Sequence, residues 1–286
     1  MGLRSTLGPP PSSDMRKALS LLFGLLISAI AVVWGFRGLD WDGIQTGLRT
    51  LSWSAVALYV LSLLIIHVLR TARWALMVRA LDPKVSVYHL VGMSFLGFAG
   101  VFLVPLRLGE LARPLLLKVH SRIGFSAGLG TVAIERAVDG LVMTGFLVGA
   151  ILLGAAPSSG MLLTGTLALG VFVGASLAFA AMARWPHASE AFWGRLLSPF
   201  GERIRDAVLG LLRGFVEGLG SLPTHSARLN YLGLTFAYWG LNGLGMWFLA
   251  TQMGLSVSLQ AMFVTMALLV VGIMVPAGPG AVGTFH

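Results

Sequence analysis

Seven apolar segments, each close to or longer than a membrane span, constrain this chain more than any other feature of its sequence. They cover residues 18–36, 53–69, 86–106, 124–155, 161–183, 229–250 and 257–276. About 20 predominantly apolar residues in a helix cross the hydrocarbon core of a bilayer. Because no water is available there to satisfy backbone polar groups, segments of this length are expected to be helical. The pattern predicts an all-α, polytopic transmembrane helix bundle with about seven or eight hydrophobic elements, one or two of them re-entrant.

Composition supports a membrane protein and argues against several other classes. The chain of 286 residues is 56% hydrophobic and 11% charged, whereas soluble domains carry about 25% charged residues. Cysteine is absent, which excludes a disulfide framework, a thiolate zinc site and a cysteine nucleophile. We attribute the net charge of +9 to arginines in cytoplasmic loops beside anionic lipid, and we expect no nucleic-acid binding.

We expect residues 18–286 to form a single integral membrane domain, preceded by a short N-terminal segment. Residues 1–17 contain three consecutive prolines and are expected to be disordered. The first apolar segment, 18–36, ends in an aromatic and basic stretch rather than a small-residue cleavage site, which predicts an uncleaved first helix. A hydrophobic bundle is not expected to stop at His286, so we expect the native chain to continue.

Basic residues orient the chain, which we place in the cell inner (plasma) membrane as a multi-pass protein. The second apolar segment is followed by Arg70 and Arg73, and further basic residues extend to position 84. We interpret 70–85 as a cytoplasmic loop and these two arginines as its basic cluster. Because the connection before the second segment balances to zero charge, the positive-inside rule also places the N-terminus in the cytoplasm.

The segment 86–106 decides whether two later basic stretches lie on the same side. If it spans fully, 107–122 and the long 185–228 connection both emerge outside, against the positive-inside rule. If it enters the membrane and returns, both are cytoplasmic. Pro105 and Gly109 supply helix breaks at the point where that return is needed. The charge distribution favours the re-entrant interpretation.

Residues 189–219 repeat apolar positions at helical spacing, with charged residues between them and a break near the Ser-Pro pair at 198–199. One interpretation is an amphipathic helix lying on the cytoplasmic membrane surface. The other is a loop helix that packs on the bundle without contacting lipid. Both helices would show the same separation of apolar and charged faces, so the pattern leaves the two interpretations open.

Six ionisable residues lie within or beside apolar segments and form the candidate site: Arg107, Glu110, Arg113, Glu135, Arg136 and Asp139. Such a group at bilayer depth costs about 2.5–3.5 kcal/mol on insertion scales and often marks a substrate or ion pathway. The six charges sum to zero, so they are able to form a structural lattice of ion pairs between helices. Alternatively they line a cavity for a lipid head group, in which the arginines bind phosphate.

A turn rich in proline and glycine follows the last apolar segment, and a similar Pro/Gly pattern occurs in the first half of the chain. Pro279, Gly280 and Gly283 belong to it, and Pro105 and Gly109 have a similar spacing after an earlier apolar segment. Paired Gly/Pro interruptions are typical of transporter sites, and free backbone N–H groups there bind phosphate. The alternative is a simple turn at the membrane surface. No nucleotide-binding loop or metal-ligand set accompanies these residues, so we expect no cofactor and no metal.

Three motifs in order complete the pattern: Pro-Leu-Arg-Leu-Gly-Glu-Leu-Ala-Arg at 105–113, Glu-Arg-Ala-Val-Asp at 135–139 and Pro-Gly-Ala-Val-Gly at 279–283. Together with Arg70 and Arg73 they resemble the flippase-like, lysylphosphatidylglycerol synthase transmembrane-region family. The alanine in the third motif stands where the family usually has a second glycine. No segment resembles the soluble aminoacyl-transfer domain of the synthases, so the resemblance implies a stand-alone membrane domain that does not aminoacylate lipid.

The resemblance implies binding and translocation of a lipid head group across the bilayer. The expected partners are a membrane lipid of phospholipid, polyisoprenoid-linked or hopanoid type and separately encoded lipid-modifying enzymes. Two alternatives stay open. One is a membrane glycosyl- or group-transferase acting on a lipid carrier, with Glu110, Glu135 or Asp139 as the base. The other is a non-catalytic membrane scaffold.

Overall fold

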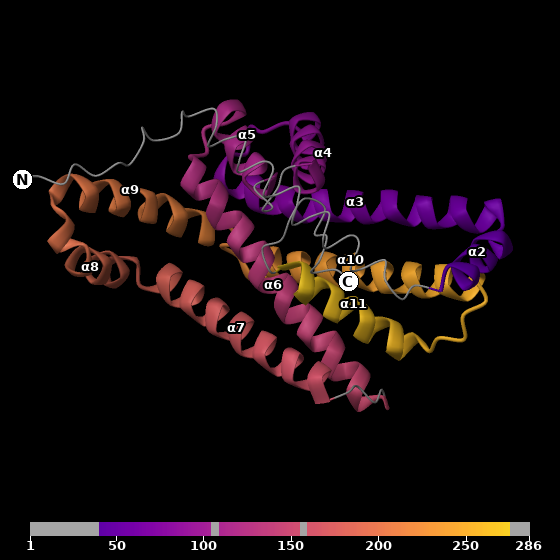
Figure 1. Ribbon diagram of the computed structural model, residues 1–286. Coiled ribbons are helices and arrows are strands. Elements are labelled where there is room, and N and C mark those ends of the chain that lie inside the picture. Colours follow the sequence, from indigo (N-terminus) through magenta and orange to yellow (C-terminus); the bar gives the residue numbers. More distant parts are fainter. Residues whose placement is uncertain (1–39, 104–108, 155–158, 275–286) are drawn as a thin grey trace, which may run out of the picture.

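The computed structural model describes residues 40–103, 109–154 and 159–274, and within these ranges it is an all-α structure without strands (Figure 1). The helices are α2 (Trp41–Thr50), α3 (Trp53–Leu81), α4 (Val87–Leu103), α5 (Ala112–His120), α6 (Phe125–Leu152), α7 (Ser159–Arg184), α8 (Pro186–Leu196), α9 (Glu202–Leu219), α10 (His225–Gln252) and α11 (Leu259–Met274), with a short 3-10 helix, η2 (Ser198–Phe200), between α8 and α9. The predicted all-α helix bundle is confirmed.

Several sequence predictions fall on residues outside the described ranges. They concern the disordered N-terminal segment 1–17, the first apolar segment 18–36, Pro105, Arg107, and the C-terminal turn with Pro279, Gly280 and Gly283. These predictions stand as they were made from the sequence.

Two of the described helices are long and apolar enough to cross a membrane by length and composition. They are α3 and the part of α7 from Gly165 to Arg184, each with a mean hydropathy of 2.0 in its most apolar window. Only 17% and 6% of those windows are buried within the structure. An apolar helix in the core of a soluble protein would be mostly covered, so these exposed apolar surfaces fit contact with lipid.

Helix α3 corrects the prediction that a basic loop begins at residue 70. The helix starts at Trp53, directly after the N-cap residue Ser52, whose side chain accepts a hydrogen bond from the amide of Ala55, and it continues to Leu81. Arg70 and Arg73 therefore lie inside the helix, and Arg73 is fully buried. The sequence interpretation ended the membrane segment at the first charges. In the structure the carboxylates of α6 neutralise these charges, so the helix continues past them.

Helices α3 and α10 lie side by side and antiparallel (Figure 1). Tyr59 approaches Gly245 near one end of the pair, and Arg73 contacts Thr235 towards the other. Helix α6 crosses this pair and also packs against α5, α7, α9 and α11. Through these contacts α6 becomes the central helix of the bundle.

Two clusters of buried apolar residues surround different parts of α6. One joins α6 to α3, α10 and α11 and includes Met143, Leu147, Trp239 and Met266. The other joins α3, α4, α5, α6 and α10 and includes Trp74, Met77, Leu90, Leu117 and Tyr231. The charged residues of α6 lie between them, because Val138 packs against both clusters.

Helices α4 and α5 form a hairpin in which the chain reverses direction. Gly97 lies against Arg113 and Gly100 lies against Gly109, so the chain direction after the turn is opposite to that of α4. At the open end, the Asp82 carboxylate accepts a hydrogen bond of 3.1 Å from the backbone amide of Arg122, which joins the two flanking turns. This reversal is what the re-entrant interpretation of 86–106 requires, while its position relative to a membrane stays a prediction.

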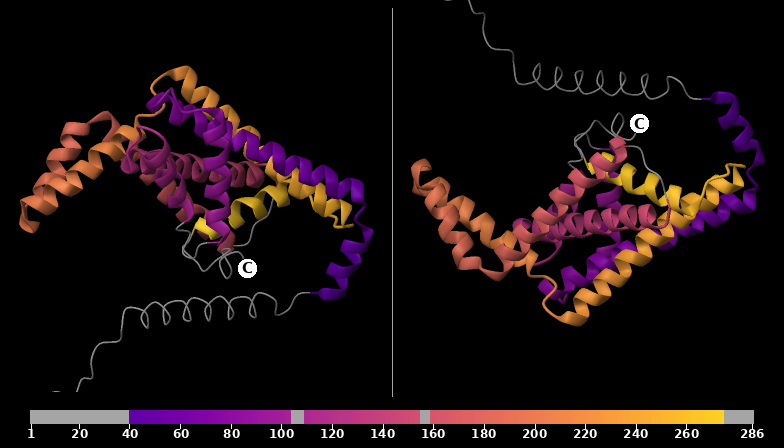
Figure 2. Two further views of the ribbon diagram at one scale, coloured as in Figure 1. Left: turned by 90° about the horizontal axis from the view of Figure 1, so that it is seen from above. Right: turned by 90° about the horizontal axis from the view of Figure 1, so that it is seen from below.

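Helices α8 and α9 form a second hairpin, which projects from the bundle at the end opposite α2 in both views of Figure 2. The chain breaks between them at η2, where the Ser-Pro pair had predicted a break. The C-terminal half of α9 packs on α6 with its backbone in direct contact, since a Cβ atom at Gly130 would lie 2.3 Å from the carbonyl oxygen of Phe215. This half of α9 therefore fits the second interpretation, a helix that packs on the bundle.

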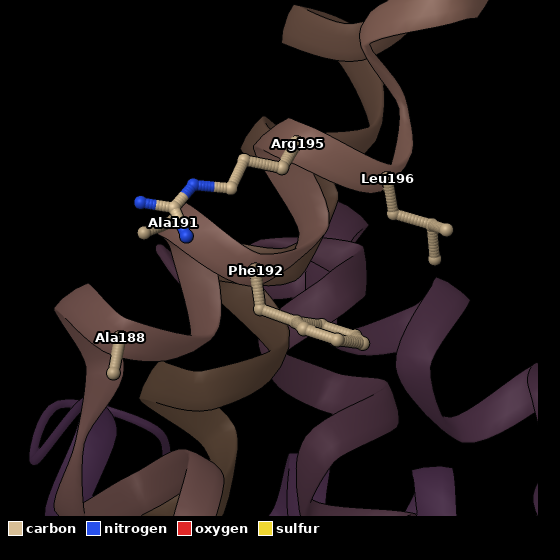
Figure 3. A pocket seen from close by; sticks show the side chains of 5 residues that line it. All are labelled: Ala188, Ala191, Phe192, Arg195 and Leu196. Carbon is tan, nitrogen blue, oxygen red and sulfur yellow. The ribbon is translucent and has the colours of Figure 1, made fainter.

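The exposed side of α8 carries apolar and basic side chains next to each other. They line a shallow surface pocket formed by Ala188, Ala191, Phe192, Arg195 and Leu196 (Figure 3). Arg195 extends beside Ala191, whereas Phe192 and Leu196 point away from it. This distribution suits a membrane surface, and the location of the hairpin at such a surface stays a prediction.

Candidate functional site

Arg73 of α3 is the centre of a buried ion-pair network. Its guanidinium group binds the Asp139 carboxylate through both terminal nitrogens, Nη1 to Oδ1 and Nη2 to Oδ2, the latter at 3.1 Å. Nη2 also donates to Oε1 of Glu135 at 2.9 Å, and Nη1 donates to the Thr235 hydroxyl at 3.3 Å. One arginine thus ties α3 to both acidic residues of α6 and to α10. Bidentate, charge-assisted contacts of this kind are among the strongest hydrogen bonds in proteins.

Glu135 is the second junction of the network. Its Oε2 accepts a hydrogen bond of 2.7 Å from Nη1 of Arg113 on α5, and its Oε1 lies 3.3 Å from Nη2 of Arg136 and 3.5 Å from Nε of Arg70. Arg113 reaches this carboxylate by passing over Gly97 of α4, where a Cβ atom would lie only 2.4 Å from its Cγ. A glycine is therefore needed on α4 for the arginine of α5 to enter the bundle.

Asp139 is held from three helices. Besides the contacts with Arg73, its Oδ1 accepts a hydrogen bond of 3.0 Å from the indole nitrogen of Trp239 on α10, and Nη2 of Arg136 lies 3.5 Å from Oδ2. The side chains of Glu135 and Asp139 are 0% and 1% exposed. Every carboxylate oxygen of this pair already has a donor or a cation beside it, so the two residues act as acceptors within the network.

Two arginines lie at the edge of the network, and their side chains are partly exposed. The side chains of Arg70 and Arg136 are 16% and 24% exposed, whereas that of Arg73 is 0% exposed. The guanidinium carbon of Arg70 lies 3.4 Å from the centroid of the Phe98 ring, a stacking contact that orients its plane. The ion pair of Arg70 with Glu135 is long and uses Nε, so it does not occupy the donors on the two terminal nitrogens.

The charges of this group do not cancel within the described part of the chain. Four arginines, Arg70, Arg73, Arg113 and Arg136, surround the carboxylates of Glu135 and Asp139. Glu110, in the turn of 3-10 helix before α5, adds an electrostatic interaction with Arg136. Four positive charges therefore face three negative ones, and the surplus lies on the side of the two partly exposed arginines. Such an arrangement favours a bound anion.

The structure brings together most of the residues proposed from the sequence. Arg113, Glu135, Arg136 and Asp139 converge in one network, Glu110 interacts with its edge, and Arg107 lies outside the described residues. Sequence reasoning missed the contribution of Arg70 and Arg73, which it had assigned to a cytoplasmic loop, and of Thr235 and Trp239. A signal was available, because no helix breaker occurs between Trp53 and Pro83.

Comparison with known proteins places this geometry in context. The chain is 24% identical, over 303 aligned residues, to "Glycosyltransferase AglD" of Haloferax volcanii, and the match covers 94% of this chain and 48% of that protein. The chain thus spans about half the length of this curated relative. No solved structure matches the chain. The family model of the lysylphosphatidylglycerol synthase TM region matches residues 21–286. The motif order, the membrane-type helices and this match together show that the chain belongs to the lysylphosphatidylglycerol synthase transmembrane-region family.

Proposed function

We propose that this protein binds the phosphate-bearing head group of a membrane lipid at the charged network and carries it across the inner membrane. The observation that supports this function is the pair of partly exposed arginines, Arg70 and Arg136, at the edge of a network with surplus positive charge. A structural lattice alone needs no accessible cation, because each unpaired charge in an apolar bundle is costly.

The two arginines have contacts that a phosphate is able to improve. Arg70 and Arg136 lie 3.5 Å and 3.3 Å from Glu135 Oε1, whereas a charge-assisted hydrogen bond to phosphate is about 2.7–2.9 Å long. The buried residue Arg73 keeps both carboxylates in place, so the edge arginines are oriented before the ligand arrives. Preorganised donors lower the entropic cost of binding an anion.

Translocation further requires that the site is reached from the membrane surface. We propose a multi-pass topology with the N-terminus and the 185–228 connection in the cytoplasm, as the positive-inside rule indicates. The α4–α5 hairpin then enters the membrane from the cytoplasmic side and contributes Glu110 and Arg113 to the network. A hydrophilic path between helices allows a head group to cross while its chains stay in lipid.

The second candidate function is transfer of a sugar or similar group to a lipid carrier, and the Haloferax volcanii relative, named as a glycosyltransferase, favours it. A general base needs an oxygen that reaches its substrate. Glu135 and Asp139 are fully enclosed by cations and donors, so Glu110, which is only partly buried, is the better base in this alternative. A scaffold without transport or chemistry is the third possibility.

A single reconstitution experiment separates the three functions. Purified protein is placed in liposomes that contain phosphatidylglycerol with a fluorescent acyl chain, and dithionite bleaches the label in the outer leaflet only. Transport predicts bleaching beyond the outer-leaflet half without any change in lipid mass. Incubation with candidate sugar donors that yields a heavier lipid supports the transferase, and neither result supports the scaffold.

Paired variants test the role of the two arginines in this assay. The double substitution Arg70→Gln and Arg136→Gln should reduce the bleaching rate by about tenfold or more, since two charge-assisted contacts to phosphate are lost. The control is Arg49→Gln with Arg203→Gln, which removes the same charge from two exposed residues on α2 and α9. Equal rates for both double variants, with both proteins folded, would argue against the proposed site.

A further inference from the structure

A cleft separate from the charged network lies between α6, α7 and the connection from α9 to α10. Its volume is about 670 Å³, and its walls are mostly apolar, with Ile134 and Leu141 of α6 facing Phe179 of α7. Figure 1 shows α7 running beside α6 over much of its length. The residues of α7 that line the cleft belong to its apolar span, of which only 6% is buried within the structure. We therefore expect a hydrocarbon chain to enter the cleft from the lipid side.

Two arginines line the cleft. Arg184 is the last residue of α7 and is exposed, with no ion pair among the described residues, and Arg228 lies in the first turn of α10. Arg228 is held by hydrogen bonds of 3.0 Å from Nε to the carbonyl oxygen of Leu222 and from Nη2 to that of Pro223. Carbonyl oxygens carry no net charge, and no acidic residue is found among the described residues that line the cleft. The two positive charges are therefore available to an anion.

Two further features point to a lipid rather than a soluble anion. Trp185, 60% exposed, follows Arg184 directly, and tryptophan beside arginine at a helix end is typical of the membrane–water interface. Deeper in the cleft, the Ser176 hydroxyl oxygen is buried without a hydrogen-bond partner among the described residues. A ligand with polar atoms between its phosphate and its hydrocarbon chain supplies that partner.

We propose that this cleft binds one anionic phospholipid as a resident ligand. Its phosphate lies between Arg184 and Arg228, its ester region meets Ser176, and one acyl chain occupies the groove between α6 and α7. The lipid holds α7 against the central helix and joins it to the start of α10. This site is distinct from the charged network, because it uses the face of α6 that carries Ile134 and Leu141 rather than Glu135 and Asp139.

Native mass spectrometry of the purified protein in detergent, with added phosphatidylglycerol or phosphatidylcholine, tests this inference. We expect one tightly bound phosphatidylglycerol in the natural protein. In the double variant Arg184→Gln and Arg228→Gln its affinity should fall roughly 30-fold, because each arginine near an anionic surface contributes about 1 kcal/mol. Phosphatidylcholine binding should change little. The control is again Arg49→Gln with Arg203→Gln, which should leave phosphatidylglycerol affinity unchanged.

A third variant tests whether the acyl chain enters the cleft. Ala180→Phe places a ring at a position of α7 that lines the cleft, and it should abolish the tight phosphatidylglycerol complex while both arginines remain. Thermal unfolding without added lipid checks that each variant is folded. The inference is overturned if the arginine variant and its control bind alike, or if Ala180→Phe retains full affinity, since the lipid would then only coat the surface.

Discussion

Replacing Arg73 with methionine tests the account of the charged network most directly, because this side chain makes more buried hydrogen bonds than the other described arginines of the network. It donates two hydrogen bonds to Asp139, one to Glu135 and one to Thr235. Hydrogen bonds to charged groups contribute about 1.5–3 kcal/mol each, but they share partners and do not add. Removing one partner from a buried ion pair costs about 3–5 kcal/mol, and we expect a loss of that size.

The expected losses of the other arginines form a graded series. Arg113→Met removes one buried contact of 2.7 Å to Glu135 and should cost about 1.5–3 kcal/mol. Arg136→Gln affects a side chain that is 24% exposed and has long contacts with both carboxylates, so its cost should stay below about 1 kcal/mol. The order Arg73, Arg113, Arg136 is thus a prediction about stability alone, and it does not depend on the lipid.

A double-mutant cycle separates charge pairing from packing. Asp139→Leu takes away the carboxylate that Arg73 binds through both terminal nitrogens, and Arg73→Met leaves Asp139 with Arg136 at 3.5 Å. When both are replaced, neither charge is left uncompensated, so the double variant should lose about 1–3 kcal/mol less than the sum of the single losses. Unfolding in mixed detergent micelles, followed by tryptophan fluorescence, measures these free energies. A loss below about 1 kcal/mol for Arg73→Met, or additive losses in the cycle, would refute the reasoning.

Other parts of the molecule give three further predictions. Gly97→Leu should displace Arg113 of α5 and abolish lipid transport. The control Gly92→Leu adds a side chain where no atom lies within 4 Å of an added Cβ, so it should keep lipid transport. Equal transport rates for the two variants would contradict the packing argument. Hydrogen bonds from the backbone amides of Arg122 and Lys84 lower the pKa of Asp82, so the stabilisation by its carboxylate is fully present above about pH 4 and is lost as pH falls through the lowered pKa. Acid unfolding curves of Asp82→Asn, whose neutral side chain does not titrate, should lack this pH-dependent loss. Cysteine at position 120 or 205 should resist membrane-impermeant thiol reagents in intact cells, and labelling at both would contradict the proposed topology.

Much of the architecture was available from local sequence patterns. Apolar runs of membrane length predicted an all-α bundle, because the absence of water forces backbone groups to bond within their own segment. The Ser-Pro pair at 198–199 predicted the break at η2. Glu135 and Asp139 lie four residues apart, a spacing that puts two side chains on one face of a helix, and both point into the same network. Each of these features depends on neighbours within one or two helical turns.

Other features depend on contacts between residues far apart in the chain. The continuation of α3 through Arg70 and Arg73 was not predicted, because the carboxylates that neutralise Arg73 lie 62 and 66 positions later. The passage of Arg113 over Gly97 and the packing of α9 on Gly130 likewise require two helices to approach each other closely.

The sequence by itself therefore determined the class of protein, the apolar segments that form its long helices and the charges that a membrane cannot leave unpaired. Only the tertiary structure decided which arginine meets which carboxylate and which two arginines remain accessible. The physical reason is that the cost of a buried charge is a local property of the side chain, whereas its compensation is supplied by whichever helices pack around it.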